Sequence, residues 1–327
     1  MGLFTPSFSA SDIPSLQGKI AIVTGATSGI GFQTCLQLAL HGAKVYLATR
    51  SESKTSSVIS QMEEEHPELK GRLVWLMTDL SSVKSCQAAA KEFEGKEERL
   101  DLLVNTGAES STPFALTEEG VSRTFSVNHL GHFALTTGLL PLLERTARLP
   151  GSDVRIVTVS SVAHAYAPAS TTFESLNEFK ATCATGAKGR VDGFRPYMAR
   201  DWHSKLANVL FAKELQRRLD AQGIPALSMS LSPGSVSTAG SKRAVGLFYY
   251  PLSALFFLTP LQGALTSLFA ATSPQVLEDR DKYRGAYLVP YGKLAKVSDK
   301  AADAAMAGRL WELSEQAMKE INEKGHI

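Results

Sequence analysis

The amino-acid sequence predicts an α/β fold in which a single, doubly wound parallel sheet carries helices on both faces. Apolar strand-like segments alternate with helix-like segments along most of the 327 residues, as in consecutive βαβ units. Most of the strand-like segments are apolar at nearly every position, which indicates that helices cover both faces of the sheet. Right-handed crossovers between parallel strands then favour the doubly wound arrangement.

Each expected element follows from a local pattern. The strand patterns are short apolar runs at Lys19–Thr24, Lys44–Thr49, Arg72–Met77, Leu100–Val104, Val154–Ser160 and Pro225–Leu231. The helix patterns between them lie at Gly29–Leu40, Ser53–His66, Ser82–Lys96, Thr117–Leu143 and Pro196–Asp220. Pro67 ends the second of these helices, because proline cannot donate to the helical hydrogen-bond ladder.

We expect residues 1–327 to form one domain, because no repeat, low-complexity stretch or linker divides them. The segments outside the alternating pattern are an N-terminal arm, an insertion, an apolar segment and a C-terminal helical extension, at 1–17, 162–196, 241–260 and 294–327. An apolar stripe in the extension predicts a helix that packs on the domain surface. This stripe comprises Leu310, Trp311, Leu313, Met318 and Ile321.

Charge and cysteine content argue against several classes of partner. The net charge is +2, from 34 basic and 32 acidic residues, so nothing indicates a nucleic-acid partner. The three cysteines, Cys35, Cys86 and Cys183, are scattered without metal-ligand spacing. We therefore expect buried thiols, no metal site and a reducing, cytoplasmic location. Residues 1–18 lack the pattern of a signal peptide, and no run of about 20 apolar residues predicts a spanning helix.

A glycine-rich loop follows the first expected strand and begins the first expected helix. Its sequence is Thr24-Gly25-Ala26-Thr27-Ser28-Gly29-Ile30-Gly31. The glycines permit a tight turn and a close approach of the backbone to a pyrophosphate, and the helix N-terminus offers free N–H groups. The sequence therefore predicts a dinucleotide site of the Rossmann type. The expected cofactor-binding residues of the loop are Gly25, Thr27, Ser28, Gly29, Ile30 and Gly31.

The spacing of this loop resembles the short-chain dehydrogenase/reductase family, and further motifs of that family follow in order over about residues 17–290. They include TDL at 78–80, NTGA at 105–108, SVNH at 126–129, VSS at 159–161 and PGSVST at 233–238. The resemblance implies cofactor contacts from Asp79, Leu80, Asn105, Gly107, Lys205, Pro233, Gly234, Val236 and Thr238. The stretches Ser204–Leu210 and Thr259–Ala264 are similar to the retinol-dehydrogenase-like and WW-oxidoreductase-like branch.

The residue after the second strand distinguishes the two nicotinamide cofactors. An acidic residue there binds a free ribose 2′-hydroxyl group, whereas an arginine favours a 2′-phosphate group. Here the strand ends in Thr49-Arg50-Ser51, with no acidic residue. Arg50 therefore predicts NADP(H), and the alternative is an arginine exposed on the surface.

The resemblance implies a catalytic set at the positions of Asp201, Lys205, Ser161 and Asn128. At the first of these positions the chain departs from the family. The family has a tyrosine four residues before its active lysine, and this chain has Asp201 four residues before Lys205. A phenol with a pKa of about 10 can donate a proton near neutral pH when a lysine lowers that pKa, whereas a carboxyl group starts at about 3.9. We expect Lys205 to lower the pKa of Asp201 further and to pair with it, so that Asp201 is ionised. Tyr197 lies a helical turn too far away to replace the tyrosine, and His203 is expected to face away.

Three interpretations of the activity remain open. The first is a redox enzyme whose proton donor is another tyrosine, a water relay or a protonated Asp201. The second is a non-redox enzyme, such as a dehydratase, isomerase or cyclase, with Asp201 as a general base. The third is a noncatalytic protein that binds the cofactor or a partner, in which Asp201 only pairs with Lys205.

The substrate side of the molecule is apolar. The insertion at 162–196 follows the catalytic strand and is well placed to cover a substrate. In the family, the region corresponding to 241–260 forms a lid, which here contains the apolar stretch Ala244–Leu258. An apolar lining predicts an apolar small molecule, polyketide- or terpenoid-like, and hence a role in secondary metabolism. Related retinol dehydrogenases act on membranes, so peripheral membrane contact is the alternative use of this lid. The family commonly pairs through its long helices, and both a monomer and a homodimer remain open.

Overall fold

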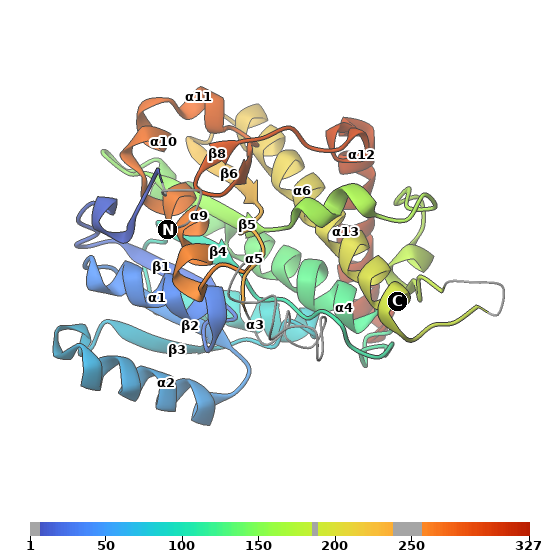
Figure 1. Ribbon diagram of the computed structural model, residues 1–327, viewed down its shortest axis with the longest axis horizontal. Helices are drawn as coiled ribbons and strands as arrows, with labels where there is room; N and C mark the ends of the chain where they lie inside the picture. Colours follow the sequence, from blue (N-terminus) through green and yellow to red (C-terminus); the bar gives the residue numbers. More distant parts are fainter. Residues whose placement is uncertain (1–6, 185–188, 238–256) are drawn as a thin grey trace.

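The computed structural model describes residues 7–184, 189–237 and 257–327. Most of the expected lid at 241–260, and the expected cofactor residue Thr238, lie outside the described residues. Eight strands form one sheet in the order β3-β2-β1-β4-β5-β6-β7-β8 (Figure 1). Neighbouring strands are parallel from β3 to β7, and only the last pair, β7 with β8, is antiparallel. The predicted α/β fold with one doubly wound sheet is confirmed, with the correction that its last strand is antiparallel.

The first strands lie close to where the apolar runs predict them. The strands are β1 (Ile20–Thr24), β2 (Lys44–Thr49), β3 (Leu73–Met77), β4 (Leu102–Asn105), β5 (Val154–Val159), β6 (Ala226–Leu231), β7 (Tyr287–Val289) and β8 (Lys293–Leu294). The last two were not predicted, because segments of three and two residues are too short to show a period.

The helices that the sequence predicts are present, with one start displaced, and α9 to α12 were not predicted. They are α1 (Gly29–Leu40), α2 (Glu52–Glu65), α3 (Val83–Glu94), α4 (Arg123–Phe125), α5 (Gly131–Ala147), α6 (Phe194–Ala221), α9 (Pro260–Thr272), α10 (Pro274–Glu278), α11 (Arg280–Tyr283), α12 (Asp299–Ala302) and α13 (Ala304–Lys324). A π-helical turn, Ser126–Leu130, joins α4 to α5. The predicted start at Thr117 is wrong, because Leu116 and Ser122 pair in an antiparallel bridge and hold the preceding chain in a turn.

Helices cover both faces of the sheet, and each face has its own apolar core. Alternate side chains of β1 enter opposite cores: Ile22 packs in the cluster that contains α3, α5, α6 and α13, whereas Ala21 and Val23 pack in the cluster that contains α1 and α9. This alternation explains why the strands are apolar at nearly every position. The C-terminal extension packs through α13, as its apolar stripe predicts, and buries Leu310, Trp311 and Ile321.

The strand order reverses at β1, which lies between β2 and β4. In open α/β sheets, such a reversal produces a crevice at the carboxyl ends of the strands, and ligands bind there. The glycine-rich loop after β1 and the loop after β4 both leave the sheet at this edge. Within the described ranges, no helix is long and apolar enough to cross a membrane.

Candidate active site

The loops after β1 and β4 pack so closely that only glycine fits at their contact. Gly25 adopts a left-handed φ of +64°, and a Cβ atom on it would lie 2.7 Å from Gly107 Cα. A Cβ atom on Gly31 would lie 2.4 Å from the carbonyl oxygen of Gly25. The Thr24 hydroxyl oxygen accepts hydrogen bonds from the backbone N–H groups of Thr106 and Gly107, each at 2.9 Å. These contacts fix the backbone of both loops at the edge of the sheet.

The N-terminus of α1 follows directly from this loop. Ser28 is its N-cap, but the Ser28 side chain makes no capping hydrogen bond, and Gly29 has a left-handed φ of +58°. The first backbone N–H groups of a helix have no intrahelical acceptor and lie at the positive end of its dipole. The site fits the pyrophosphate of a dinucleotide for two reasons. The glycines leave the backbone free of side chains that would block the phosphate groups, and the N–H groups at the start of α1 can donate hydrogen bonds to them.

The expected adenosine contacts lie on neighbouring strands at the same edge of the sheet. Arg50 is exposed directly after β2, and Asp79 and Leu80 follow β3. The Asp79 carboxylate accepts hydrogen bonds from the Ser81 N–H group and hydroxyl group, at 2.9 and 2.7 Å. Leu80 packs on the loop after β4, since a Cβ atom on Gly107 would lie 2.4 Å from Leu80 Cδ1. Leu80 therefore adjoins the glycine cradle, which comprises the backbone of Gly25, Gly31 and Gly107.

Two further expected residue groups lie at the carboxyl ends of β4 and β6. Asn105 ends β4; its Nδ2 atom donates to Thr136 Oγ1 at 3.1 Å, while its buried Oδ1 atom has no hydrogen-bond partner. After β6, Pro233 precedes Gly234, which has a left-handed φ of +82°. Val236 pairs with the chain before α9 in an isolated parallel bridge. The chain after β6 is thereby held beside the start of α9.

Asn128 connects the π-helical turn to α6. Its Nδ2 atom donates to the Ser204 hydroxyl oxygen at 2.9 Å and to the Glu109 carbonyl oxygen at 3.1 Å. The Ser204 hydroxyl group in turn donates to the carbonyl oxygen of Asp201 at 2.7 Å. This chain of hydrogen bonds fixes the turn of α6 that carries Asp201 and Lys205.

The end of β5 is tied to the same part of α6. The Ser160 hydroxyl group donates to the carbonyl oxygen of Lys205 at 2.7 Å. Ser161 is the N-cap of the short 3₁₀ helix Val162–Tyr166, and its hydroxyl oxygen accepts from the Ala163 N–H group at 3.1 Å. These bonds hold the backbone of Lys205 at the end of β5 and connect Asn128 to the turn of α6 that carries Asp201, while Ser161 follows β5 directly.

The electrostatics of Asp201 differ from the expectation. Burial raises the pKa of the Asp201 carboxyl group above its ordinary value, and attraction to Lys205 opposes this shift only in part. Burial likewise lowers the pKa of Lys205, against the attraction of Asp201. The two side chains form no salt bridge in the described part of the chain. The predicted ion pair and the predicted lowering of the Asp201 pKa are therefore wrong. Loss of hydration destabilises both charged groups, and at the distance between them their mutual attraction offsets only part of that cost.

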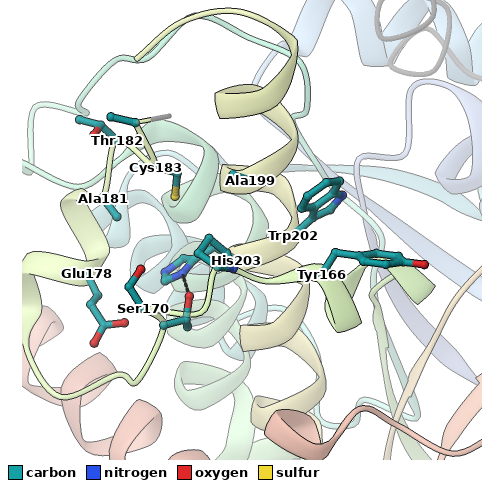
Figure 2. Close-up of a pocket in the computed structure, with 12 residues that line it drawn as sticks. Tyr166, Ser170, Glu178, Ala181, Thr182, Cys183, Ala199, Trp202 and His203 are labelled. Atoms are coloured by element: carbon teal, nitrogen blue, oxygen red, sulfur yellow. Dashed lines mark hydrogen bonds between the residues drawn. The ribbon is translucent and has the colours of Figure 1, made fainter. Parts of the chain in front are cut away.

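A cavity of about 480 Å³ lies between the insertion and α6 (Figure 2). Its lining includes Tyr166, Pro168, Thr171, Cys183, Trp202 and His203. The rings of Tyr166 and Trp202 lie 5.6 Å apart between centroids, so the cavity begins at the residue next to Asp201. His203 is buried, and its Nδ1 atom hydrogen-bonds with Thr171 Oγ1 at 3.0 Å. Cys183 is only partly buried, unlike Cys35 and Cys86.

Arg200 organises the insertion and was not identified from the sequence. Its guanidinium group is almost fully buried and donates to the carbonyl oxygens of Thr182 and Val191, at 2.8 and 2.7 Å. A third bond, of 2.9 Å, reaches the carbonyl oxygen of Thr112 in the loop after β4. The sequence offered one signal, an arginine directly before Asp201, but its acceptors are backbone atoms that no residue pattern marks.

Comparison with known proteins places these features in a family. The sequence model described as short chain dehydrogenase matches residues 19–173. A short chain dehydrogenase/reductase of Colletotrichum higginsianum is 43% identical over 311 residues, covering 95% of this chain and 77% of that protein. One of Armillaria gallica is 40% identical over 312 residues, covering 94% of this chain and 95% of that protein.

Solved structures with the same fold support this assignment. An uncharacterized protein from Mycobacterium paratuberculosis is 31% identical with a TM-score of 0.71, covering 96% of this chain and 98% of that one. Pseudomonas aeruginosa RhlG in an active-site complex with NADP is 20% identical with a TM-score of 0.60, covering 88% and 97% of the two chains, and shares the fold. The glycine cradle, the strand order and these relatives together show that the chain belongs to the short-chain dehydrogenase/reductase family.

Proposed function

We propose that the protein is an NADP(H)-dependent oxidoreductase that interconverts a carbonyl group and an alcohol on an apolar small molecule, with protonated Asp201 as the proton donor. The observation that carries this proposal is the position of Asp201, a half-buried carboxyl group one helical turn before the buried Lys205, where loss of hydration raises its pKa. A carboxyl group that keeps its proton to higher pH can donate it where the family pattern has a tyrosine.

Several observations support NADP(H) as the cofactor. The fit of the glycine cradle to a pyrophosphate supports a dinucleotide. Arg50 is exposed at the end of β2, where a guanidinium group can pair with a ribose 2′-phosphate group. Chains of the same fold, including RhlG, have been solved with NADP. Their identity to this chain is low, so Arg50 is the residue on which the preference rests.

The chemistry divides between cofactor and protein. A reduced nicotinamide supplies a hydride to the carbonyl carbon, and Asp201 supplies a proton to the carbonyl oxygen. The Ser161 hydroxyl group donates a hydrogen bond to that oxygen as negative charge develops on it. Lys205 would stabilise negative charge that develops on the oxygen, and Asn128 positions the turn of α6 through Ser204. In the oxidative direction, the ionised Asp201 accepts the alcohol proton.

The substrate class follows from the surroundings of the site. Tyr166 and Trp202, the residue after Asp201 in the sequence, contribute aromatic surface to the cavity of about 480 Å³, a volume that accommodates a small organic molecule. The resemblance to the retinol-dehydrogenase-like branch supports the same class. We infer an apolar, polyketide- or terpenoid-like substrate and a role in secondary metabolism.

The test is cofactor consumption by the purified protein with a panel of apolar ketones. We expect NADPH to be consumed faster than NADH, and Asp201→Asn to lower the rate about 100- to 10,000-fold, the usual contribution of a general acid. Asp281→Asn, at a side chain that is 92% exposed, is the matched control. Asp201→Tyr should retain activity, because it restores a phenol. An Asp201→Asn protein that folds normally and reduces ketones at the parental rate would rule out this role.

A non-redox enzyme is the second candidate, because the same raised pKa makes an ionised Asp201 a stronger base. Such an enzyme would remove a proton next to a carbonyl group in a dehydration, isomerisation or cyclisation. Turnover of a substrate with the NADPH absorbance unchanged, abolished by Asp201→Asn, would favour this candidate over the first.

A further inference from the structure

We propose that Lys300, in the C-terminal extension, is a positioning residue that fixes one wall of the cavity and so determines which substrates the cavity accepts. The wall is the segment 168–172, and two of its residues, Pro168 and Thr171, line the cavity. The part of this proposal that concerns substrates rests on the proposed function, whereas the part that concerns the wall does not.

The contacts of Lys300 carry the proposal. Its ammonium group donates to the carbonyl oxygens of Pro168 and Ala169, each at 2.8 Å, and to that of Thr171 at 3.0 Å. An ammonium group has three N–H donors, so these acceptors use all of them. The positive charge of Lys300 also lies close enough to His203, another residue of the cavity lining, to help lower the pKa of that imidazole, although burial lowers it most.

The wall has no regular secondary structure of its own, so side chains hold its backbone. Arg309 donates to the carbonyl oxygen of Thr172 at 3.3 Å, and Glu178 accepts from the Thr172 N–H group at 2.9 Å. The Thr171 hydroxyl group meets His203 of α6 at 3.0 Å. Lys300 and Arg309 both come from the extension, which therefore supplies much of the polar support of the wall.

Lys300 is itself held in a fixed place. It belongs to α12, whose N-cap Ser298 accepts from the Ala301 N–H group and donates its own N–H group to His164 Nε2 at 3.1 Å. His164 lies in the 3₁₀ helix that Ser161 begins. One structural unit thus joins the catalytic strand end, α12 and the wall.

Removal of the ammonium group would leave the carbonyl oxygen of the buried Thr171 without this donor, whereas that of Pro168 would keep the Thr171 N–H group and that of the exposed Ala169 could bind water. A buried or half-buried acceptor that loses its partner turns towards water at a cost of about 1–3 kcal/mol. Because Pro168 and Thr171 line the cavity, this movement would change the cavity's shape without touching the cofactor cradle. Substrates that fill the cavity should therefore be affected, and small ones should not.

The experiment compares Lys300→Met, which keeps the length of the side chain, with Lys296→Met, an exposed control in the same extension. Lys300→Arg is the conservative variant. Hydrogen exchange of the 169–174 amides reports the wall. KM and kcat for benzophenone and cyclohexanone report large and small substrates. We expect faster exchange and a KM for benzophenone raised about tenfold in Lys300→Met, with kcat, the cyclohexanone KM and NADPH affinity unchanged. Lys300→Arg should restore much of the difference.

Two results would overturn the proposal. Exchange in the wall that equals that of Lys296→Met would show that Lys300 does not fix the wall. Faster exchange with parental KM values for both ketones would show that the wall does not select substrates. If neither the parent protein nor any variant oxidises NADPH, the proposed function fails independently of the role of Lys300. In that case the affinity for benzophenone, measured by quenching of tryptophan fluorescence, replaces KM as the test of Lys300.

Discussion

At the scale of single residues, the charge state of Asp201 is set by a competition between burial and one cation. Burial favours the neutral carboxyl group, and the attraction of Lys205 favours the carboxylate. Because Lys205 is also buried and its own pKa is lowered, its positive charge is itself costly there. The two opposed shifts bring the pKa of the carboxyl group and that of the ammonium group closer together than in water.

This shift predicts how the rate depends on pH. A proton donor works only while protonated, so kcat/KM for ketone reduction should fall as pH rises through the raised pKa of Asp201. The inflection should lie above about 3.9, the ordinary value for an aspartate. A pH series of NADPH consumption measures it, and the same series on Asp201→Asn should lack this limb. A rate that instead rises with pH in the reductive direction would contradict a donor role.

At the scale of elements, the contact between the loops after β1 and β4 decides whether the cradle can form. The space that the pyrophosphate would use exists because Gly25, Gly31 and Gly107 carry no Cβ atom. The nearest obstructing atoms at Gly25 and Gly31 belong to the backbone, which cannot move away as a flexible side chain would.

Gly31→Ala should therefore destabilise the protein by about 1–3 kcal/mol, as overpacking usually does, and abolish NADPH binding. The control is Gly308→Ala in α13, where nothing lies within 4 Å of an added Cβ atom. That substitution should stabilise the protein by up to about 1 kcal/mol, because alanine favours a helix interior. Urea unfolding and NADPH titration measure both variants. A Gly31→Ala protein with parental NADPH affinity would disprove the cradle.

The sequence predicts some elements with their bounds and misses others. The bounds of α1 and β2 match their predicted segments, because apolar spacing and the adjoining turn residues define both. The turn before Arg123 was missed, because the bridge between Leu116 and Ser122 depends on tertiary pairing. The motifs predict the order of the site residues along the chain. They do not predict the pKa of Asp201, because its exposure to water depends on how the folded chain packs around it.

At the scale of the whole molecule, the C-terminal extension closes one face of the core. Trp311 of α13 lies 4.9 Å from Phe133 of α5 and 5.8 Å from Phe211 of α6, between ring centroids. Arg218 lies over the same indole ring, at 4.4 Å. The faces of α5 and α6 that carry Phe133 and Phe211 are thus occupied from within the chain, so these side chains cannot also pack against a second subunit.

Trp311→Ala should lower the free energy of unfolding by about 3–5 kcal/mol, the usual cost of truncating a buried aromatic side chain. Glu315→Ala, on the exposed side of the same helix, is the control and should change stability by less than about 0.5 kcal/mol. Chemical denaturation followed by circular dichroism measures both. Equal midpoints for the two variants would mean that α13 contributes little to the core.

The anchors of the wall lie far along the chain from the backbone that they hold. Lys300 and Arg309 bond to carbonyl groups at sequence separations of 129 to 137 residues, whereas Thr24 reaches Gly107 at a separation of 83. A ribosome makes the chain from its N-terminus, so the loops that cradle the nucleotide can meet while the anchors are still unmade. A nascent chain therefore acquires the geometry of its cofactor end first, and its substrate chamber takes shape last.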